Sequence, residues 1–427
     1  MTALFLLAAL FVLVLINVPI AVALGVIAAF AMVAESGMDV MLTAAVTMYD
    51  GAKTFPLIAI PLFILAGAIM NTSGISRRLI AFASSLLGFI RGGLAMVDVG
   101  TSIFFAEISG SAVADVAALG SILIPAMKKK GYPRTLAAAV TSSSASLAII
   151  IPPSIPMILY AVMADTSVVQ LFVAGFIPGF IGAAGLMAMA YWFAVRYDLP
   201  VEEVFQLRRV WTTFKDAIWA FLLPIIILGG IFGGIVTATE GAALAVVAAL
   251  FVGGVIYREL ELRHLYRLII DGAVQTAVVM LLVATSALLG LYLTESGVPQ
   301  MLAQSITDLT ENRYAVLALL NGLFLVLGCF LHSAAAIILV VPIVMPIVHL
   351  VEIDPVHFGL IVTLNMAIGQ QTPPVASVLI TTCSIAKADV WEVSKVNVYF
   401  IAVLFGVLMR VTYVPIIPLA LVELFYR

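Results

Sequence analysis

Long apolar blocks separated by short polar loops run through the whole chain. A helix needs about 20 residues to cross a bilayer, and several of these blocks reach or exceed that length. They cover residues 3–33, 55–72, 93–127, 135–163, 170–196, 216–257, 268–293, 314–350, 356–386 and 396–424. The pattern predicts an all-α polytopic membrane protein.

Two halves of the chain carry the same arrangement of prolines. Pro125 precedes the pair Pro152 and Pro153, and Pro346 precedes the pair Pro373 and Pro374 at an identical spacing. All three prolines of one half are therefore related to those of the other by one constant offset. Internal repeats whose apolar segments are interrupted by proline are typical of secondary transporters built from inverted repeats. In such transporters the substrate site lies where the repeats meet.

Basic residues give the expected orientation. Arg91 and the run Lys128 to Lys130 flank the block 93–127, so both of its ends belong in the cytoplasm. We therefore expect a re-entrant helical hairpin at 93–127. Its counterpart at 314–350 is followed by VEIDPVHF, which lacks Lys and Arg, and is expected to enter from outside.

The expected organisation is a first inverted repeat over residues 1–196, a cytoplasmic linker over 197–215 and a second inverted repeat over 216–427. Block 216–257 should form two helices that meet near Thr237 to Glu240. Residues 3–33, with a bend expected near Pro19, are short for two spans. The topology of residues 1–33 stays open.

Composition agrees with a membrane protein. Of 427 residues 64% are hydrophobic and 10% charged, whereas a soluble domain is about half apolar and a quarter charged. The mean hydropathy is +1.22. A net charge of −3 with scattered basic residues gives no indication of a nucleic-acid partner. Cys329 and Cys383 lack metal-site spacing and are interpreted as small apolar residues.

The prolyl pairs suggest the chemistry. They interrupt the segments TSSSASLAIIIPPSIP at 141–156 and VTLNMAIGQQTPPVAS at 362–377. Proline breaks a helix, and the carbonyls that it frees cannot face lipid unpaired. Hydroxyl, amide and carbonyl oxygens are hard ligands that suit Na⁺. The alternative is a pair of structural kinks bridged by water and hydroxyl groups.

These residues resemble a known family. GSAVADVAALGSILIPAM and IIPPSIPMILY in the first half, with TATEGAA, IDPVHFG and GQQTPP in the second, are similar to motifs of the large membrane subunit of tripartite ATP-independent periplasmic (TRAP) transporters. The resemblance implies an elevator-type, Na⁺-driven importer of organic acids in the bacterial inner membrane. It also implies two partners, a small four-helix membrane subunit and a periplasmic solute-binding protein.

The resemblance also implies site residues, and no organic cofactor beside the coupling ion Na⁺. The first Na⁺ site would comprise Ser109, Gly110, Ser111, Ser144, Ala145 and Pro152, and the second Leu331, His332, Ser333, Asn365, Gly369 and Thr372. Substrate would contact Ser142, Ser143, Ser144, Asn365, Gln370 and Thr372. The chain departs from the family pattern at His332, where Asp is usual, and at Ala376, where Gly is usual.

Three acids in the apolar blocks are candidates for tuning the field at a cation site: Glu107, Asp115 and Glu240. Buried charges in a membrane are costly, which makes them functional candidates. The structural alternative is that Glu107 and Asp115 hydrogen-bond backbone donors of the hairpin or pair with Arg and Lys at the membrane interface, and that Glu240 stabilises a helix end or joins the repeats.

Two other functions remain for comparison. One is a self-sufficient symporter of Na⁺ and divalent anions that needs no binding protein. The resemblance implies a C4-dicarboxylate or an acidic sugar as substrate, and this substrate class does not distinguish such a symporter from an importer that needs a binding protein. The other is an intramembrane enzyme, which is disfavoured because Ser111 lies in SGSAVA rather than GxSxG and no histidine occurs in the same half.

Overall fold

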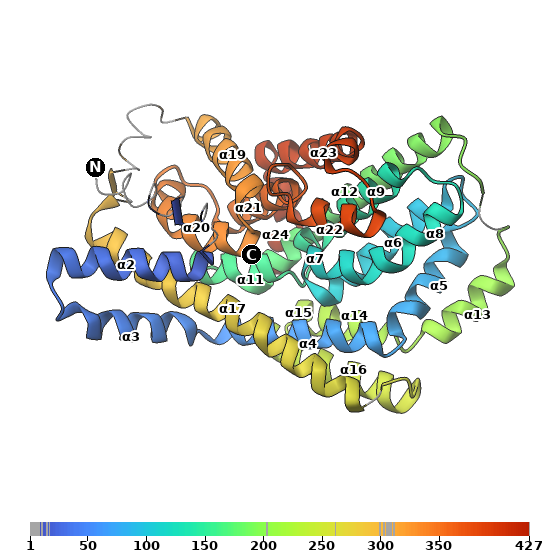
Figure 1. Ribbon diagram of the computed structural model, residues 1–427, viewed down its shortest axis with the longest axis horizontal. Coiled ribbons are helices and arrows are strands. Elements are labelled where there is room, and N and C mark those ends of the chain that lie inside the picture. Colours follow the sequence, from blue (N-terminus) through green and yellow to red (C-terminus); the bar gives the residue numbers. More distant parts are fainter. Residues whose placement is uncertain are drawn as a thin grey trace.

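The computed structural model is a bundle of helices (Figure 1). It describes residues 9, 12, 13, 16, 18–201, 204–260, 262–298, 300, 301, 304, 310 and 312–426. Within these residues the one β contact is an isolated bridge between Arg91 and Val201. Eight described helices are long and apolar enough to cross a membrane, or nine if one bent pair forms a single span. The expected all-α polytopic fold is confirmed.

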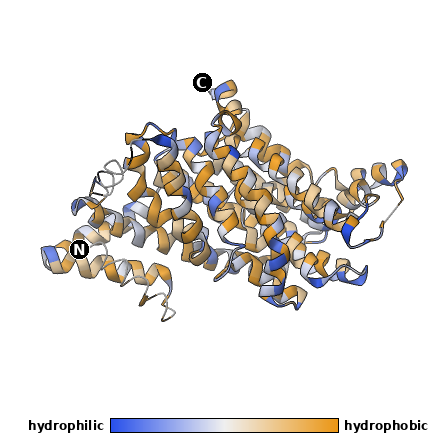
Figure 2. Cartoon of the chain, turned by 90° about the horizontal axis from the view of Figure 1, so that it is seen from above, coloured by the Kyte–Doolittle hydropathy of each residue, from blue (hydrophilic) through white to orange (hydrophobic). Residues whose placement is uncertain are grey.

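Hydrophobic residues cover most of the helical length, and hydrophilic residues gather at helix ends and in loops (Figure 2). This distribution suits a chain whose outer surface faces lipid along the helices and water at their ends.

One group of helices packs around the long helix α17, Leu262–Glu295. Its neighbours include α2, Ile20–Ser36, α3, Val40–Ala52, and α4, Ala59–Thr72, which lie beside α17 in Figure 1. Helix α2 begins directly after Pro19, where proline favours a helix start. Most of residues 1–17 lie outside the described residues, so the fold of the block 3–33 is described only from Val18 onward.

The two expected hairpins form as helix, break and helix. In the first, α6, Gly93–Ser109, ends at Gly110, and the chain continues as α7, Ala112–Asp115, a π-helical turn, Val116–Gly120, and α8, Ser121–Lys129. In the second, α19, Arg313–Phe330, and α20, Ser333–Leu350, are separated by Leu331 and His332. Gly110 has a φ of 59°, a conformation that glycine adopts without steric cost.

The two expected proline breaks are also present. In the first half α9, Arg134–Ala145, and α10, Leu147–Ile150, are followed by the irregular segment 151–154 and by α11, Ile155–Met163. In the second half α21, Pro355–Gly369, ends before an irregular segment that leads to α22, Ser377–Ala386. Two long helices complete the halves, α12, Val168–Arg196, and α23, Val390–Tyr413, and α24, Ile416–Tyr426, follows α23.

Helix starts in the two halves correspond closely. The offset that relates the prolines of the two halves also relates the start of α7 to that of α20 and the start of α9 to that of α21. The starts of α11 and α22 depart from this offset by a single position. The offset between the two halves therefore relates the starts of whole helices as well as the prolines.

The middle of the chain joins the halves. The segment 197–215, expected as a linker, contains most of helix α13, Leu207–Ala217, which packs against α5, Ile75–Leu87. Short helices α14, Leu222–Pro224, and α15, Gly230–Phe232, flank the π-helical turn Ile225–Gly229 and precede α16, Ala238–Phe251. The expected junction is confirmed, because Thr237 and Glu240 form a capping box at the start of α16.

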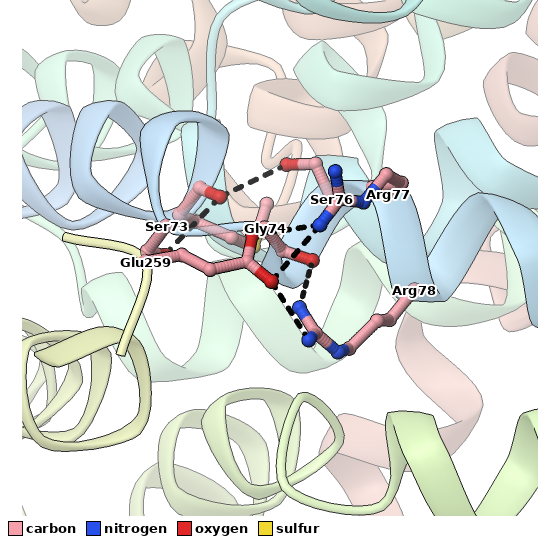
Figure 3. A network of polar contacts seen from close by, with 7 residues as sticks. Ser73, Gly74, Ser76, Arg77, Arg78 and Glu259 are labelled. Atoms are coloured by element: carbon pink, nitrogen blue, oxygen red, sulfur yellow. Dashed lines mark hydrogen bonds and ion pairs between the residues drawn. The ribbon is translucent and has the colours of Figure 1, made fainter. Parts of the chain in front are cut away.

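An ion-pair cluster fastens the start of α5 to the segment before α17 (Figure 3). Glu259 accepts hydrogen bonds from Arg77 at 2.7 Å and from Arg78 at 2.8 Å, and Arg78 also donates to the carbonyl of Gly74 at 3.0 Å. The Arg78 guanidinium lies 3.7 Å from the ring centroid of Tyr257. Because the contacts join residues far apart in the sequence, they fix one helical junction against another.

Candidate functional site

The tips of both hairpins open onto one cavity of about 870 Å³. Gly110 and Ser111 line it from the first tip, and His332 and Ser333 line it from the second. The opposite wall includes α17, which contributes Asp271 and Gln275, together with α2 and α4. The cavity thus lies between two tips at equivalent positions of the two halves, as expected for a site at the meeting point of two repeats.

The first tip contacts the first proline break directly. The amide of Ile155 donates to the carbonyl of Gly110 at 3.2 Å. A Cβ atom on Gly110 would lie 2.9 Å from the carbonyl oxygen of Pro153, so a larger residue would push the tip away. Gly110, Ser111 and the segment beside Pro152 are therefore brought together.

The second tip is held in a comparable way. The amide of Val375 donates to the carbonyl of Cys329 at 3.1 Å, which joins the second break to the end of α19. His332 accepts a hydrogen bond at Nδ1 from the amide of Ala334 at 3.4 Å and thereby caps α20. Its side chain is exposed, and it lines the cavity.

Unsatisfied oxygen atoms in the broken helices fit a hard cation. Ser142 Oγ and Asn365 Oδ1 are buried and have no hydrogen-bond partner in the described structure, although the amide of Asn365 donates to Asn321 at 2.7 Å. Thr372 Oγ1 donates to the carbonyl of Ile368 at 2.9 Å and keeps lone pairs available. Hydroxyl and amide oxygens are the donor types that Na⁺ takes.

A buried polar network links the two broken helices and was missed by the sequence reasoning. Ser143 Oγ lies 2.7 Å from Gln371 Oε1 and 2.9 Å from Asn397 Oδ1. Gln371 Nε2 donates to Ser146 Oγ at 2.7 Å. Gln371 stands in the polar run GQQTPP, which could have indicated it. Asn397 is one of several polar residues in α23, and nothing in the sequence distinguishes it from the others. The network ties α9 and α10 to the second break and to α23.

The expected site residues do not all meet at the cavity. Gly110, Ser111, His332, Ser333 and Gln370 line it. Five of them are buried in the broken helices: Ser142, Ser143, Ser144, Ala145 and Asn365. Gly369 is the last residue of α21, and Thr372 lies in the irregular segment that follows. Pro152 lies in the first proline break, and Leu331 lies at the tip of the second hairpin.

The three candidate acids lie in different surroundings. Asp115 is buried beside the π-helical turn that follows the first tip. Glu240 is exposed and receives the amide of Thr237 at 2.8 Å, so its observed contact is that of a helix cap. The side chains of Glu107 and Ser109 lie outside the described part of the structure.

Comparisons with known proteins identify the architecture. Residues 7–417 match the family model described as "Tripartite ATP-independent periplasmic transporter, DctM component". The chain is 39% identical over 405 residues to the isethionate TRAP transporter permease protein DctMQ of Oleidesulfovibrio alaskensis, and the match covers 95% of this chain and 64% of that protein. It is 38% identical to the C4-dicarboxylate TRAP transporter large permease protein DctM of Pseudomonas aeruginosa, covering 90% of each chain.

A solved structure shares the fold. The crystal structure of the YdaH transporter of Alcanivorax borkumensis aligns with a TM-score of 0.63 at 15% identity, covering 88% of each chain.

Proposed function

The chain belongs to the DctM family of tripartite ATP-independent periplasmic transporters, and we propose on that premise that it imports organic acids in symport with Na⁺. The family consists of transporter permeases rather than enzymes. Its members work with a small membrane subunit and a periplasmic binding protein, and they lie in the bacterial inner membrane. The chain is accordingly a multi-pass membrane protein.

The composition of the cavity wall carries the proposal. The described residues that line the cavity include no Lys or Arg. An anionic substrate in this cavity would need positive charge from another source, because an unpaired charge away from water is costly. Bound Na⁺ would supply that charge, and the N-terminus of α20, which starts at the second tip, adds a favourable dipole.

Two Na⁺ sites are proposed from the tips and breaks. The first would use Ser111, the Gly110 carbonyl and hydroxyls near Ser144, and the second would use Asn365 Oδ1, Thr372 and carbonyls near Gly369. Substrate would lie in the cavity between the sites, beside Gln370. The Nε2 atom of Gln370 is buried without a hydrogen-bond partner in the described structure.

Inverted repeats and an elevator motion are part of the proposal. The repeated spacing of helices and the meeting of both tips at one cavity support them. Opposite orientations of the halves require that a cysteine replacing Lys129 is labelled from the cytoplasm and one replacing Glu352 from the periplasm. Labelling of both from the same side would contradict the inversion.

The substrate and the partners follow from the relatives. The chain spans 64% of the isethionate permease named above and 59% of the sialic acid TRAP transporter permease protein SiaT of Haemophilus influenzae. We propose a C4-dicarboxylate or an acidic sugar as substrate, a four-helix membrane protein as the small subunit, and delivery by a periplasmic solute-binding protein.

Reconstitution tests the proposal. The chain and its candidate partners are placed in liposomes, and uptake of labelled acids is measured with and without an inward Na⁺ gradient. Uptake that needs both the gradient and the binding protein is expected. Robust uptake by the chain alone would support a self-sufficient symporter. Uptake that is the same with and without the Na⁺ gradient would exclude Na⁺ coupling.

A further inference from the structure

A basic cavity lies where α5, α13 and the segment before α17 meet. Its volume is about 610 Å³, which is within the range of small-molecule sites. Arg77 and Arg78 line it from α5, and Lys215 lines it from α13. The other lining residues are Ala81, Thr213, Asp216, Trp219 and Tyr257. None of these residues lines the cavity between the hairpin tips, so the two cavities are separate.

Hydrogen bonds and a ring contact join the walls of the basic cavity to one another. The hydroxyl of Tyr257 donates to the carbonyl of Asp216 at 2.8 Å, which joins the segment before α17 to α13. The guanidinium of Arg78 lies 3.7 Å from the ring centroid of Tyr257. Thr213 Oγ1 and Ser85 Oγ form a hydrogen bond of 2.8 Å between α13 and α5. The basic side chains are therefore carried by walls with fixed relative positions.

The two arginines share one carboxylate. Arg77 and Arg78 lie 2.7 and 2.8 Å from the carboxylate oxygens of Glu259 (Figure 3). The hydrogen bonds of Arg77 to Glu259 both come from Nη2, so its Nε and Nη1 atoms keep donors for another acceptor. The Arg77 side chain is 71% exposed, and these donors can be reached by a ligand.

The charges of the basic cavity favour an anion. Lys215 makes no ion pair among the described residues, and its ammonium lies 5.2 Å from the ring centroid of Trp211. The acids of the cavity and its wall are Asp216 and Glu259, so the three basic side chains exceed the acids by one charge. Guanidinium and ammonium groups bind phosphate oxygens through charge-assisted hydrogen bonds. A phosphodiester, which carries one negative charge, matches this excess.

Apolar side chains beside the basic cavity indicate a membrane interface. Trp219, which lines the cavity, is 47% exposed, and its neighbour Ile218 is 48% exposed. The chain turns by 58° between α13 and the segment Leu222–Phe232. A short helix that carries basic and aromatic residues and turns away from the next segment is typical of the membrane surface. Basic residues place this end of the molecule on the cytoplasmic side.

We propose that the basic cavity binds the phosphate group of an anionic phospholipid in the cytoplasmic leaflet, with the acyl chains lying against Trp219 and Ile218. Basic pockets between helices on this side of a membrane bind anionic headgroups. A soluble phosphate ester would satisfy the charges but would leave the apolar surface uncovered. The proposal goes beyond Na⁺ symport and needs neither Na⁺ nor substrate, so its failure would not affect the proposed transport function.

Native mass spectrometry of the purified full chain in a neutral detergent tests the binding. Phosphatidylglycerol and zwitterionic phosphatidylcholine with the same acyl chains are compared, and we expect one phosphatidylglycerol to bind in preference. Arg77→Gln and Lys215→Gln should each weaken this binding by roughly fivefold. Arg208→Gln is the matched control, because Arg208 is exposed on α13 but does not line the cavity, and it should bind as wild type does. Melting temperatures confirm that the variants are folded, and Lys215→Gln tests the site if Arg77→Gln does not fold.

Tryptophan fluorescence gives the location. Replacing the other three tryptophans by Phe leaves Trp219 as the reporter, in bilayers of brominated phosphatidylcholine that quench it. Phosphatidylglycerol without bromine should restore the fluorescence at a lower mole fraction than phosphatidylcholine without bromine.

Three results would overturn the proposal. The first is equal binding of the two lipids, or equal recovery of Trp219 fluorescence by them. The second is the same loss of binding in Arg208→Gln as in Arg77→Gln and Lys215→Gln, which would indicate attraction to the surface as a whole. The third is binding of glycerol phosphate as tight as that of phosphatidylglycerol, which would assign the cavity to a soluble phosphate ester.

Discussion

Gly328 and Gly369 meet backbone against backbone where the second hairpin crosses the second broken helix. A Cβ atom on Gly369 would lie 2.5 Å from the Cα atom of Gly328, and one on Gly328 would lie 3.0 Å from the Cα atom of Gly369. Backbone atoms cannot move aside as a flexible side chain can. The proposed second Na⁺ site therefore depends on the absence of side chains at these positions.

Gly369→Ala should force the two helices apart. Overpacking of this kind costs about 1–3 kcal/mol, so we expect a lower melting temperature in detergent and reduced Na⁺-dependent uptake. Gly322→Ala is the control, because Gly322 lies on α19, the helix that carries Gly328, and a Cβ atom there meets nothing within 4 Å. Equal melting temperatures for the two variants would contradict the close contact.

Gln370 and Gln371 are neighbours with different expected roles. Gln371→Ala removes partners from Ser143 and Ser146, and leaving buried polar groups unsatisfied costs about 1–3 kcal/mol. Its main effect should be a lower melting temperature. Gln370 lines the cavity, so Gln370→Ala should raise the KM for substrate with a smaller effect on stability. A lower melting temperature for Gln370→Ala than for Gln371→Ala, together with a higher KM for Gln371→Ala, would contradict these roles.

Local signals made much of the fold predictable. Proline pairs, glycines and hydropathy predicted the breaks at 141–156 and 362–377 and the junction at Thr237, because each depends on neighbouring residues. Helix α3 was missed, since Val40–Ala52 mixes apolar residues with Thr, Tyr and Asp. The topology of residues 1–33 and the boundaries of the two repeats remain predictions.

Contacts between distant residues were not predictable from the sequence. Ser144 reaches Asp98 across 46 positions, and Ser143 reaches Gln371 across 228. Such pairs are set by how whole helices pack, and one sequence contains no signal for that packing. The close approach of Gly328 to Gly369 is of the same kind, because glycine is compatible with many environments.

Ala376 adopts a backbone conformation that favours glycine. Its φ is 38° and its ψ 56°, in the left-handed region, which costs a residue with a Cβ about 1–2 kcal/mol. Ala376→Gly should therefore raise the melting temperature, although greater freedom of the unfolded chain offsets part of the gain. Ala386→Gly, at the last residue of α22, should lower it by contrast, because it removes a fully buried methyl group. A decrease in both variants would show that the strain at Ala376 is negligible.

Ser111 and Thr372 are expected to serve different Na⁺ sites. Ser111→Ala and Thr372→Val each remove the hydroxyl group proposed as a Na⁺ ligand, and each should weaken the Na⁺ dependence of uptake by about tenfold, or 1.4 kcal/mol. Thr381→Val is the control for Thr372→Val, since Thr381 also donates to a carbonyl four residues earlier, at 2.8 Å, but lies within α22, beyond the second proline break. Na⁺ titrations unchanged from wild type would remove Ser111 and Thr372 from the sites.

The segment after α20 is the expected docking face for a binding protein. Glu352 is exposed there, so Glu352→Lys changes surface charge without removing a buried contact. Electrostatic complementarity acts mainly on association, so this variant should slow uptake at low binding-protein concentration and much less at saturation.

Asp354 needs a separate control. It accepts hydrogen bonds from the amides of Val356 at 2.8 Å and His357 at 3.1 Å, so Asp354→Lys also loses the cap of α21, worth about 1 kcal/mol. Asp389 caps α23 in the same way, and Asp389→Lys should lower stability without changing the dependence on binding protein. If Glu352→Lys and Asp389→Lys gave the same uptake curves against binding-protein concentration, docking at this face would be excluded.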